Sequence, residues 1–245
     1  MRNDATQGLG RMVREDMTPY YDHKGITLYN QDCMEAMKEM PNKAFELAIV
    51  DPQYGIGLDM VYSHGTSKSG TIHAKKEWNN NPPTENYFIE LHRVSRNQII
   101  WGCNYFARWI PAVGRIIHDK QLQIDGTALR WSEADIASCS LQKRITMFRY
   151  RWNGNVQGNT INWKNTGIDA RIHPTQKPVA LYKWLLKNYA KPGDRILDTH
   201  LGSGSSAIAC DVMGFELTGY EIDEDYFNAA VDRLKQHQSQ VVLQL

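Results

Sequence analysis

Residues 44–54 read AFELAIVDPQY and join a short apolar run to an acidic turn. The run is partly β-branched and is followed at once by Pro52 and Gly55, so it predicts a buried strand that delivers Asp51 to a loop. An acid at the carboxyl end of a buried strand lies where open α/β sheets bind their ligands. Pro52 restricts the backbone of Asp51, and Tyr54 adds a flat ring. Together they can hold a planar molecule that carries an amino group; an ordinary strand-to-loop turn is the alternative.

Length and composition favour one sizeable α/β domain. With 245 residues, 42% of them hydrophobic, the chain can build a packed core and a small insertion. No apolar run approaches ~18 residues and the first residues are too polar for a signal peptide, so we expect a cytoplasmic protein without a membrane partner. The four cysteines lack paired spacing, which favours reduced thiols over a disulfide framework or a metal site. Since the net charge is only +1, a polyanionic partner needs a local concentration of positive charge.

The pattern along the chain predicts an arm over residues 1–18 and a single domain over residues 19–245. Apolar and β-branched runs predict strands over 26–29, 98–101, 115–118, 195–198 and 216–221. Helical spacing predicts helices over 34–40, around 87–91, from 179 towards 191, up to about 213, and over 225–236. The stretch 55–83 is long and polar, and loops of this length are usually functional or disordered.

The segment 142–171 carries six basic residues against one acid, a local charge of +5. Within it residues 148–152, FRYRW, alternate strictly, so as a strand they would place three rings on one face and two guanidiniums on the other. Phosphates favour arginine and unstacked bases favour rings, which predicts contact with nucleic acid. A half-buried strand with solvated arginines is the alternative. The candidate DNA-binding residues, two of them in the polar stretch, are Lys75, Lys76, Arg144, Arg149, Arg151 and Trp152.

A second pattern lies near the carboxyl end of the chain. Gly202, Gly204 and Ala207 fit the glycine pattern of a strand–turn–helix nucleotide site. Glu221 follows Gly202 by 19 positions at the end of the next strand, where an acid can accept hydrogen bonds from ribose hydroxyls. The combination predicts an adenosine-containing cofactor.

The position of this glycine turn separates the candidate classes. Only 41 of the 245 residues follow Gly204, so the remaining strands of the sheet must come from the amino-terminal half. The strand that ends at Asp51 is therefore expected beside the glycine turn, in a permuted order. A nicotinamide dehydrogenase normally places its glycine turn early, so this class is disfavoured.

Three motifs in this order resemble those of a known family. Residues 51–54, DPQY, are similar to the Asp-Pro-Pro-Tyr motif of amino-methyltransferases, with Gln53 in place of a proline. Residues 198–204, DTHLGSG, resemble their S-adenosylmethionine loop, with His200 in place of a phenylalanine, and residues 173–178, HPTQKP, resemble the segment that precedes it. The order resembles the permuted β-group of adenine-specific DNA methyltransferases of bacteria and phages, over about residues 24–235.

The resemblance implies a Rossmann-like α/β fold, with a mostly parallel, doubly wound sheet in circularly permuted order and a target-recognition insertion over about 119–172. It implies site-specific methyl transfer from S-adenosylmethionine to the amino group of adenine in double-stranded DNA, a role in restriction-modification, and a homodimer as one expected assembly. Asp51, Pro52, Gln53 and Tyr54 are the implied catalytic residues. The implied cofactor residues are Asp32, Cys33, Asp51, Thr175, Lys177, Asp198, His200, Leu201, Gly202, Ser203, Gly204, Ser205, Glu221 and Ile222.

Three alternatives share the motifs. Enzymes that methylate the cytosine amino group more often begin the motif with serine, so Asp51 favours adenine. Enzymes that methylate a protein glutamine typically begin it with asparagine, in the unpermuted order. A nucleic-acid-binding protein that keeps the fold but has impaired catalysis is the alternative from another class, and Gln53 and His200 are its only hints.

Overall fold

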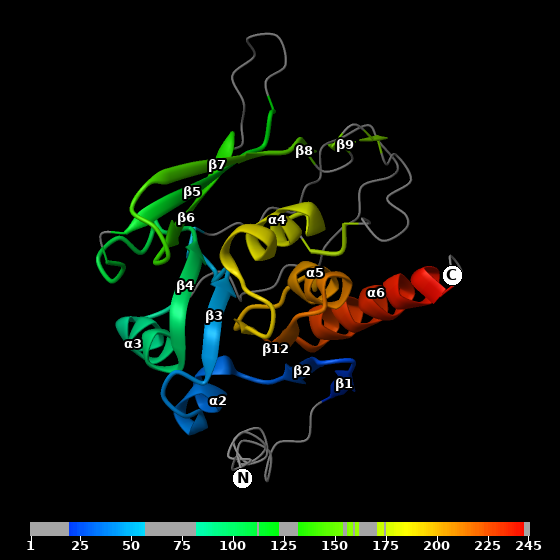
Figure 1. Cartoon of the computed structure of the whole chain (residues 1–245), viewed down its shortest axis with the longest axis horizontal. Helices are drawn as coiled ribbons and strands as arrows, with labels where there is room; N and C mark the ends of the chain where they lie inside the picture. The colour runs from blue at the N-terminus through cyan, green and yellow to red at the C-terminus, as the bar shows by residue number, and fades with distance from the viewer. Residues whose placement is uncertain are drawn as a thin grey trace, which may run out of the picture.

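The computed structural model describes residues 20–56, 82–111, 113–122, 132–153, 156–158, 160–161, 171–173 and 175–242, and its centre is a nine-stranded mixed sheet (Figure 1). The strand order in this sheet is β1-β2-β12-β11-β3-β4-β6-β5-β7. These strands are β1 (Tyr21–His23), β2 (Ile26–Asn30), β3 (Phe45–Val50), β4 (Ser95–Trp101), β5 (Gly114–Asp119), β6 (Ala134–Cys139), β7 (Ile145–Arg149), β11 (Arg195–Asp198) and β12 (Glu216–Glu221). A small separate sheet contains β8 (Trp152–Asn153), β9 (Val156–Gln157) and β10 (Thr160–Ile161).

The middle of the large sheet is parallel. Strands β2, β12, β11, β3 and β4 all run in one direction, while β6 is antiparallel to both β4 and β5. The carboxyl ends of five neighbouring strands therefore lie along one edge of the sheet, where α/β proteins place their ligands.

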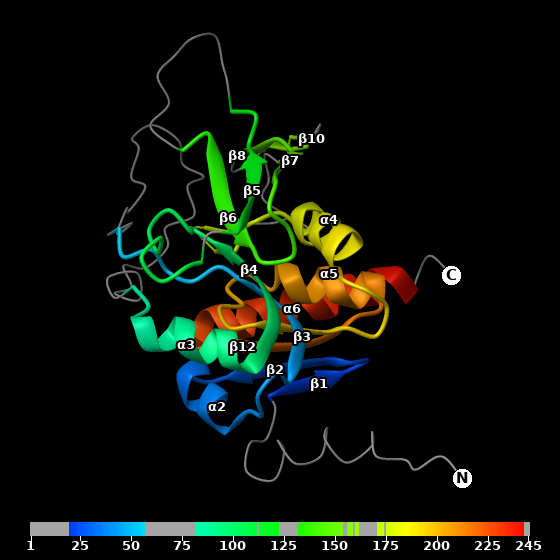
Figure 2. The same cartoon turned by 60° about the vertical axis from the view of Figure 1, so that its left-hand side comes forward.

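Helices cover both faces of the parallel part (Figures 1 and 2). Helices α2 (Cys33–Glu39) and α3 (Glu85–Val94) pack on one face, and helices α4 (Val179–Tyr189), α5 (Ser205–Met213) and α6 (Glu224–Val242) pack on the other. Strand β3 shows why both faces are covered, because Leu47 and Ile49 enter one apolar cluster and Ala48 and Val50 enter the other. The predicted doubly wound, mostly parallel α/β fold is confirmed.

The pairing of β3 with β11 is the feature that builds the site. Leu47 pairs with Ile196 and Ala48 with Leu197, so the strand that ends before Asp51 lies beside the strand that leads into the glycine turn. At the opposite end of this pair, the Arg195 Nε donates to Glu46 Oε2 at 3.1 Å. The expected adjacency of the two segments is confirmed.

Several elements differ from the sequence expectation. Strands β1 and β6 and the small sheet were not expected, because their short sequences lack a clear apolar alternation; β6 is held by pairing with β4 and β5 on its two sides. Helix α6 extends to Val242, beyond the expected end near 236.

The expected strand over 148–152 is interrupted after Arg149. The chain still follows the end of β5, because Tyr150 N donates to Asp119 O at 3.1 Å and Trp152 N to Lys120 O at 3.2 Å. The predicted alternation therefore survives the interruption: the rings of Phe148, Tyr150 and Trp152 are half-buried and the intervening arginines are exposed.

The expected arm over 1–18 and most of the stretch 55–83 lie outside the described residues. All four cysteines are buried and free of disulfides, as the sequence predicts. Within the described ranges, none of the helices combines the length and the apolar character that crossing a membrane requires.

Candidate active site

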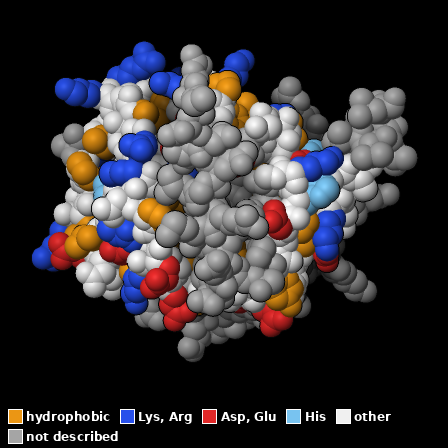
Figure 3. All heavy atoms as spheres, turned by 60° about the horizontal axis from the view of Figure 1, so that its bottom comes forward, with side chains coloured by type: hydrophobic (Ala, Val, Ile, Leu, Met, Phe, Trp, Pro, Cys, Tyr) orange, Lys and Arg blue, Asp and Glu red, His pale blue; other side chains and the backbone are white. Residues whose placement is uncertain are grey.

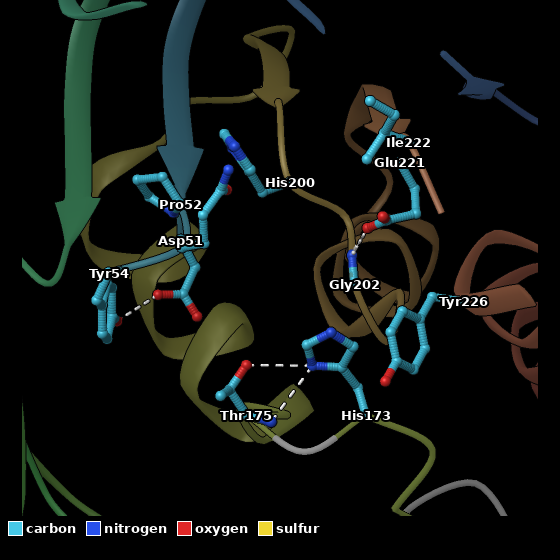
Figure 4. A pocket seen from close by; sticks show the side chains of 11 residues that line it. Asp51, Pro52, Tyr54, His173, Thr175, His200, Gly202, Glu221, Ile222 and Tyr226 are labelled. Atoms are coloured by element: carbon cyan, nitrogen blue, oxygen red, sulfur yellow. Dashed lines mark hydrogen bonds between the residues drawn. The ribbon is translucent and has the colours of Figure 1, made fainter. Parts of the chain in front are cut away.

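A cavity that opens to solvent lies at the carboxyl ends of β3, β11 and β12 (Figure 4). The acidic turn lines one side and the glycine turn lines the other, so two stretches about 150 positions apart in the chain face the same space. Its lining residues are Asp51, Pro52, Gln53, Tyr54, His173, Thr175, His200, Gly202, Glu221, Ile222 and Tyr226.

Two donors hold the carboxylate of Asp51. The Tyr54 hydroxyl donates to Oδ1 at 2.5 Å, and the Lys177 ammonium donates to Oδ2 at 2.5 Å. Burial and the Asp51 charge raise the pKa of Tyr54 well above its ordinary value, so the hydroxyl keeps its proton and remains a donor. A carboxylate has about four lone-pair sites, so Asp51 can still accept a hydrogen bond from a ligand.

The turn after β4 fixes the ring of Tyr54. Tyr105 stacks on this ring with centroids 4.9 Å apart, and Phe106 meets it edge-on at 6.1 Å. Gly102 has a positive φ of 68°, and a Cβ atom there would lie 2.1 Å from Cε1 of Tyr54. Only glycine therefore allows both this turn and the close approach of the ring.

Buried polar groups hold the glycine turn in place. Asp198 accepts hydrogen bonds from His200 N at 3.1 Å and from Ser206 Oγ at 2.5 Å, and burial raises the pKa of Asp198 to about 7. The buried guanidinium of Arg233 donates to Ser203 O at 2.8 Å and to Ser205 Oγ at 2.9 Å. These contacts fix the entry into α5 and direct the turn towards the cavity.

Glu221 closes the other side of the cavity. Its carboxylate accepts from Gly202 N at 2.8 Å and from Asp223 N at 3.0 Å, and burial raises the pKa of Glu221 despite these two donors. Ile222 beside it is 65% exposed. An acid and an exposed apolar side chain therefore lie together at the mouth of the cavity.

His200 lies between the two halves of the site. Its Nδ1 is 2.9 Å from Thr199 Oγ1, and its ring meets Tyr87 edge-on with centroids 5.3 Å apart. Burial lowers the pKa of His200 to about 4, so the imidazole is neutral at pH 7.

The structure brings together nine of the residues that the motifs single out, and all nine line the cavity: Asp51, Pro52, Gln53, Tyr54, Thr175, His200, Gly202, Glu221 and Ile222. Others do not line it, namely Asp32, Cys33, Lys177, Asp198, Leu201, Ser203, Gly204 and Ser205. The carboxylate of Asp32 caps α2 by accepting from Met34 N at 2.8 Å.

Two lining residues were not among the candidates. His173 and Tyr226 pack against each other with ring centroids 4.4 Å apart, and Thr175 N donates to Nδ1 of His173 at 3.3 Å. The HPTQKP motif could have indicated His173. Tyr226 is one aromatic residue at the start of α6, and nothing in its sequence neighbourhood separates it from a core residue.

Of the candidate DNA-binding residues, three arginines lie on or beside β7 at the edge of the large sheet, and Trp152 begins β8 of the small sheet. Arg144, Arg149 and Arg151 are exposed, and Arg149 Nε lies 3.6 Å from Asp119 Oδ2. The Trp152 indole is half-buried and donates to Gln176 O at 2.7 Å. Lys75 and Lys76 lie outside the described residues.

The rings of this segment also serve packing. The Phe148 ring lies 5.4 Å from that of Trp184 and stacks on Tyr150 at 5.9 Å. Part of the aromatic character of the segment therefore belongs to the contact between the outer strands and α4, which the alternative interpretation of a half-buried strand anticipates.

Comparison with known proteins finds similarity to DNA methyltransferases. The model of an N6/N4 DNA methylase family matches residues 109–232, half of the chain. The chain is 24% identical to Type II methyltransferase M.ScaI of Streptomyces caespitosus, over 89% of this chain and 84% of that protein. It is 20% identical to the DNA adenine methyltransferase YhdJ of Escherichia coli, over 87% and 84% of the two chains.

The fold is also similar to those of solved structures. PvuII DNA methyltransferase (cytosine-N4-specific) aligns with a TM-score of 0.58 at 11% identity, over 91% of this chain and 94% of that one. The M1.HpyAVI–SAM complex aligns with a TM-score of 0.52 at 16% identity, over 85% and 98% of the two chains.

Proposed function

Because the chain belongs to the N6/N4 family of DNA methylases, we propose that it moves a methyl group from S-adenosylmethionine to the exocyclic amino group of adenine in double-stranded DNA. The observation that carries the proposal is the shared cavity, in which the Asp51 carboxylate on one side faces the glycine turn and Glu221 on the other (Figure 4).

The residues on the glycine side fit S-adenosylmethionine. Gly202 has a φ of 52°, and a Cβ added there would meet no atom closer than 3.9 Å, so the cavity is open where the backbone turns. Glu221 retains lone pairs for ribose hydroxyls, while Ile222 and the neutral ring of His200 offer apolar and aromatic surface to an adenine ring. When bound, the cofactor supplies an electrophilic methyl group on its sulfonium.

Asp51 and Pro52 would activate the target nitrogen. The adenine amino group is a poor nucleophile because its lone pair is delocalised into the ring. Accepting its two hydrogens on the Asp51 carboxylate and the Pro52 carbonyl localises this pair on nitrogen. The contacts from Tyr54 and Lys177 orient the carboxylate before the base arrives, which favours a near-attack geometry.

The target base must leave the duplex to reach this site. The nitrogen to be methylated is stacked inside DNA, whereas Asp51 is 13% exposed at the wall of a cavity. We therefore expect the base to be flipped out and to stack on the ring of Tyr54, with the basic outer strands in contact with phosphates.

Adenine is favoured over cytosine by the acid that begins the motif. Asp51 occupies the position where cytosine enzymes more often have serine, and one relative along most of the chain is a DNA adenine methyltransferase. A structural neighbour is cytosine-N4-specific, but at 11% identity its likeness concerns the fold alone.

The test is methyl transfer to unmethylated genomic DNA from labelled S-adenosylmethionine, followed by digestion to nucleosides. We expect label in N6-methyladenine; label in N4-methylcytosine would overturn the base assignment, and unlabelled DNA would overturn the activity. Asp51→Ala should lower transfer by at least about 10³-fold while S-adenosylmethionine binding, measured by calorimetry, stays within a few-fold. Full activity in this variant would remove Asp51 from its proposed role.

A further inference from the structure

Lys177 belongs to the HPTQKP segment but does not line the cavity. Its side chain is 6% exposed, and its Nζ lies 2.5 Å from Asp51 Oδ2 and 3.3 Å from the Tyr54 hydroxyl. The same ammonium lies over the ring of Trp101, 5.3 Å from its centroid. Lys177 thus points at the carboxylate of the acidic turn.

A second carboxylate shares this cation. Burial alone would lower the pKa of Lys177, but the facing charges of Asp51 and Asp135 outweigh burial and raise it, so the side chain stays charged. Burial likewise opposes ionisation of Asp135 on β6, yet Lys177 and Lys120 hold the pKa of Asp135 well below its usual range. The Lys120 ammonium is 2.7 Å from Asp135 Oδ1.

Hydrogen bonds and a proline also fix the backbone around Lys177. Gln176 O accepts from the Trp152 indole at 2.7 Å, and Gln176 Oε1 accepts from Ile172 N at 3.0 Å. Pro178, the N-cap residue of α4, follows Lys177 and restricts it to an extended backbone. The ammonium therefore reaches Asp51 from a fixed position.

We propose that Lys177 is a positioning residue for methyl transfer, which keeps Asp51 ionised and turned towards the target amino group and does not bind the cofactor. The inference rests on the proposed function, since it assigns Asp51 the role of acceptor. An ionised carboxylate can accept both the Tyr54 hydroxyl and a substrate amino hydrogen, whereas a protonated one turns an acceptor into a donor.

Without Lys177, the charge of Asp51 would be left among acids and neutral phenols. The groups around it from the packed elements are Tyr54 on its own turn, Asp135 on β6, Asp198 on β11, Tyr87 on α3 and Tyr182 on α4. The two acids repel the charge of Asp51, the three phenols are neutral, and Tyr54 donates a hydrogen bond to the carboxylate. Beside these five groups, Lys177 supplies a positive charge at contact distance.

The test compares Lys177→Met and Lys177→Arg with Lys183→Met, a matched loss of an exposed lysine on α4. Single-turnover methylation is measured from pH 5 to 9, together with S-adenosylmethionine affinity. For Lys177→Met we expect the rate at pH 7 to fall about 10²-fold and the acid limb of the pH–rate profile to move to higher pH, with cofactor affinity within about threefold. Lys177→Arg keeps the charge, so its acid limb should stay in place while its altered geometry lowers the rate about tenfold.

Two results would overturn the inference. One is a tenfold or greater loss of cofactor affinity with an unmoved acid limb, which would make Lys177 a cofactor residue; the other is a wild-type rate at every pH. If melting curves show that Lys177→Met does not fold, Lys177→Arg decides: a lowered rate with unchanged cofactor affinity supports the inference, and a wild-type rate overturns it.

A readout without DNA separates this inference from the proposed function. The side-chain carboxyl signal of Asp51, assigned in ¹³C NMR spectra by its loss in Asp51→Asn, should have a different chemical shift in Lys177→Met than in wild type, because the carboxylate loses the ammonium that contacts it. If wild-type protein methylates no DNA but this signal still moves, the proposed function fails and the positioning contact stands. An unmoved signal contradicts the contact itself.

Discussion

His200 is a half-buried, neutral imidazole at a position where the family that the chain resembles usually has phenylalanine, and its titration makes the folded state less stable in acid. Burial lowers the pKa of His200 to about 4 in the folded state, whereas an unfolded histidine titrates near 6.5. The unfolded chain therefore takes up this proton first. The stability that the neutral ring contributes is fully present above about pH 6.5 and is lost as the pH falls towards 4.

His200→Phe should remove this acid sensitivity. Relative to its own stability at pH 8, the wild type should lose about 1–2 kcal/mol more than the variant at pH 5, or several degrees in Tm. Thermal unfolding at the two pH values checks this, with His23→Phe, a change at an exposed histidine, as the control. Equal pH dependence of wild type and His200→Phe would contradict the burial argument.

At the scale of single residues, the sequence identifies those site residues whose role is indicated by the local pattern around them. Asp51 follows a buried strand and precedes a proline, and Glu221 has the spacing expected after the glycine turn, so both were assigned from the pattern. The contact of Lys177 joins it to a residue 126 positions away. A local sequence pattern cannot indicate a contact between residues so far apart in the chain. The resemblance instead implies that Lys177 binds the cofactor.

The turn after β4 is the element that holds the ring of Tyr54 in place. Gly102→Ala would place a Cβ 2.1 Å from the Tyr54 ring at a backbone φ of 68°, so the ring must move away from Asp51. We expect methyl transfer to fall at least about 10²-fold with cofactor affinity retained, measured by single-turnover assay and calorimetry.

Gly193 provides the matched control for this change. Its φ is 89°, but a Cβ there would meet nothing within 4 Å, so Gly193→Ala adds the same kind of backbone strain without displacing a ring. Its cost should be limited to about 1 kcal/mol of stability. Similar activities in the two variants would show that contact with Tyr54 is not what Gly102 protects.

Elements with a strong apolar pattern can be predicted from the sequence. Elements that form because adjacent strands pair with them cannot. The five parallel strands and their helices follow from apolar runs, and proline or glycine marks some of the ends, as Pro52 does after β3 and Gly102 after β4. Strand β6, ADIASC, has a weak pattern and becomes a strand because β4 and β5 flank it. The outer part of the sheet, which includes the predicted target-recognition insertion, was accordingly the least well predicted.

At the scale of the whole molecule, a net charge of only +1 conceals an uneven distribution. On the face shown in Figure 3, lysine and arginine reach the upper edge and also lie along both sides, whereas most acidic side chains lie in the middle and lower parts. The exposed arginines Arg144, Arg149 and Arg151 are on or beside β7, at the edge of the large sheet. Such a distribution lets a nearly neutral protein bind a polyanion through one region.

Replacing these three arginines by glutamine should weaken DNA binding and its salt dependence. Each phosphate contact contributes a slope of about −0.9 in log K against log salt, so the slope should fall by up to about 3. Fluorescence anisotropy between about 50 and 200 mM salt measures it. Arg96→Gln is the control, because Arg96 is exposed at the amino end of β4, the end away from the cavity; an unchanged slope in the triple variant would place the DNA elsewhere.

The strand order also bears on how the chain is made. Strand β12 lies between β2 and β11, yet it is translated about 190 residues after β2. Until residues 216–221 have left the ribosome, the short strand β1 is the one partner of β2 in the described sheet that has already been made. The central sheet therefore assembles late in synthesis, through contacts of long sequence separation that close slowly, and the nascent chain exposes unpaired strand edges until then.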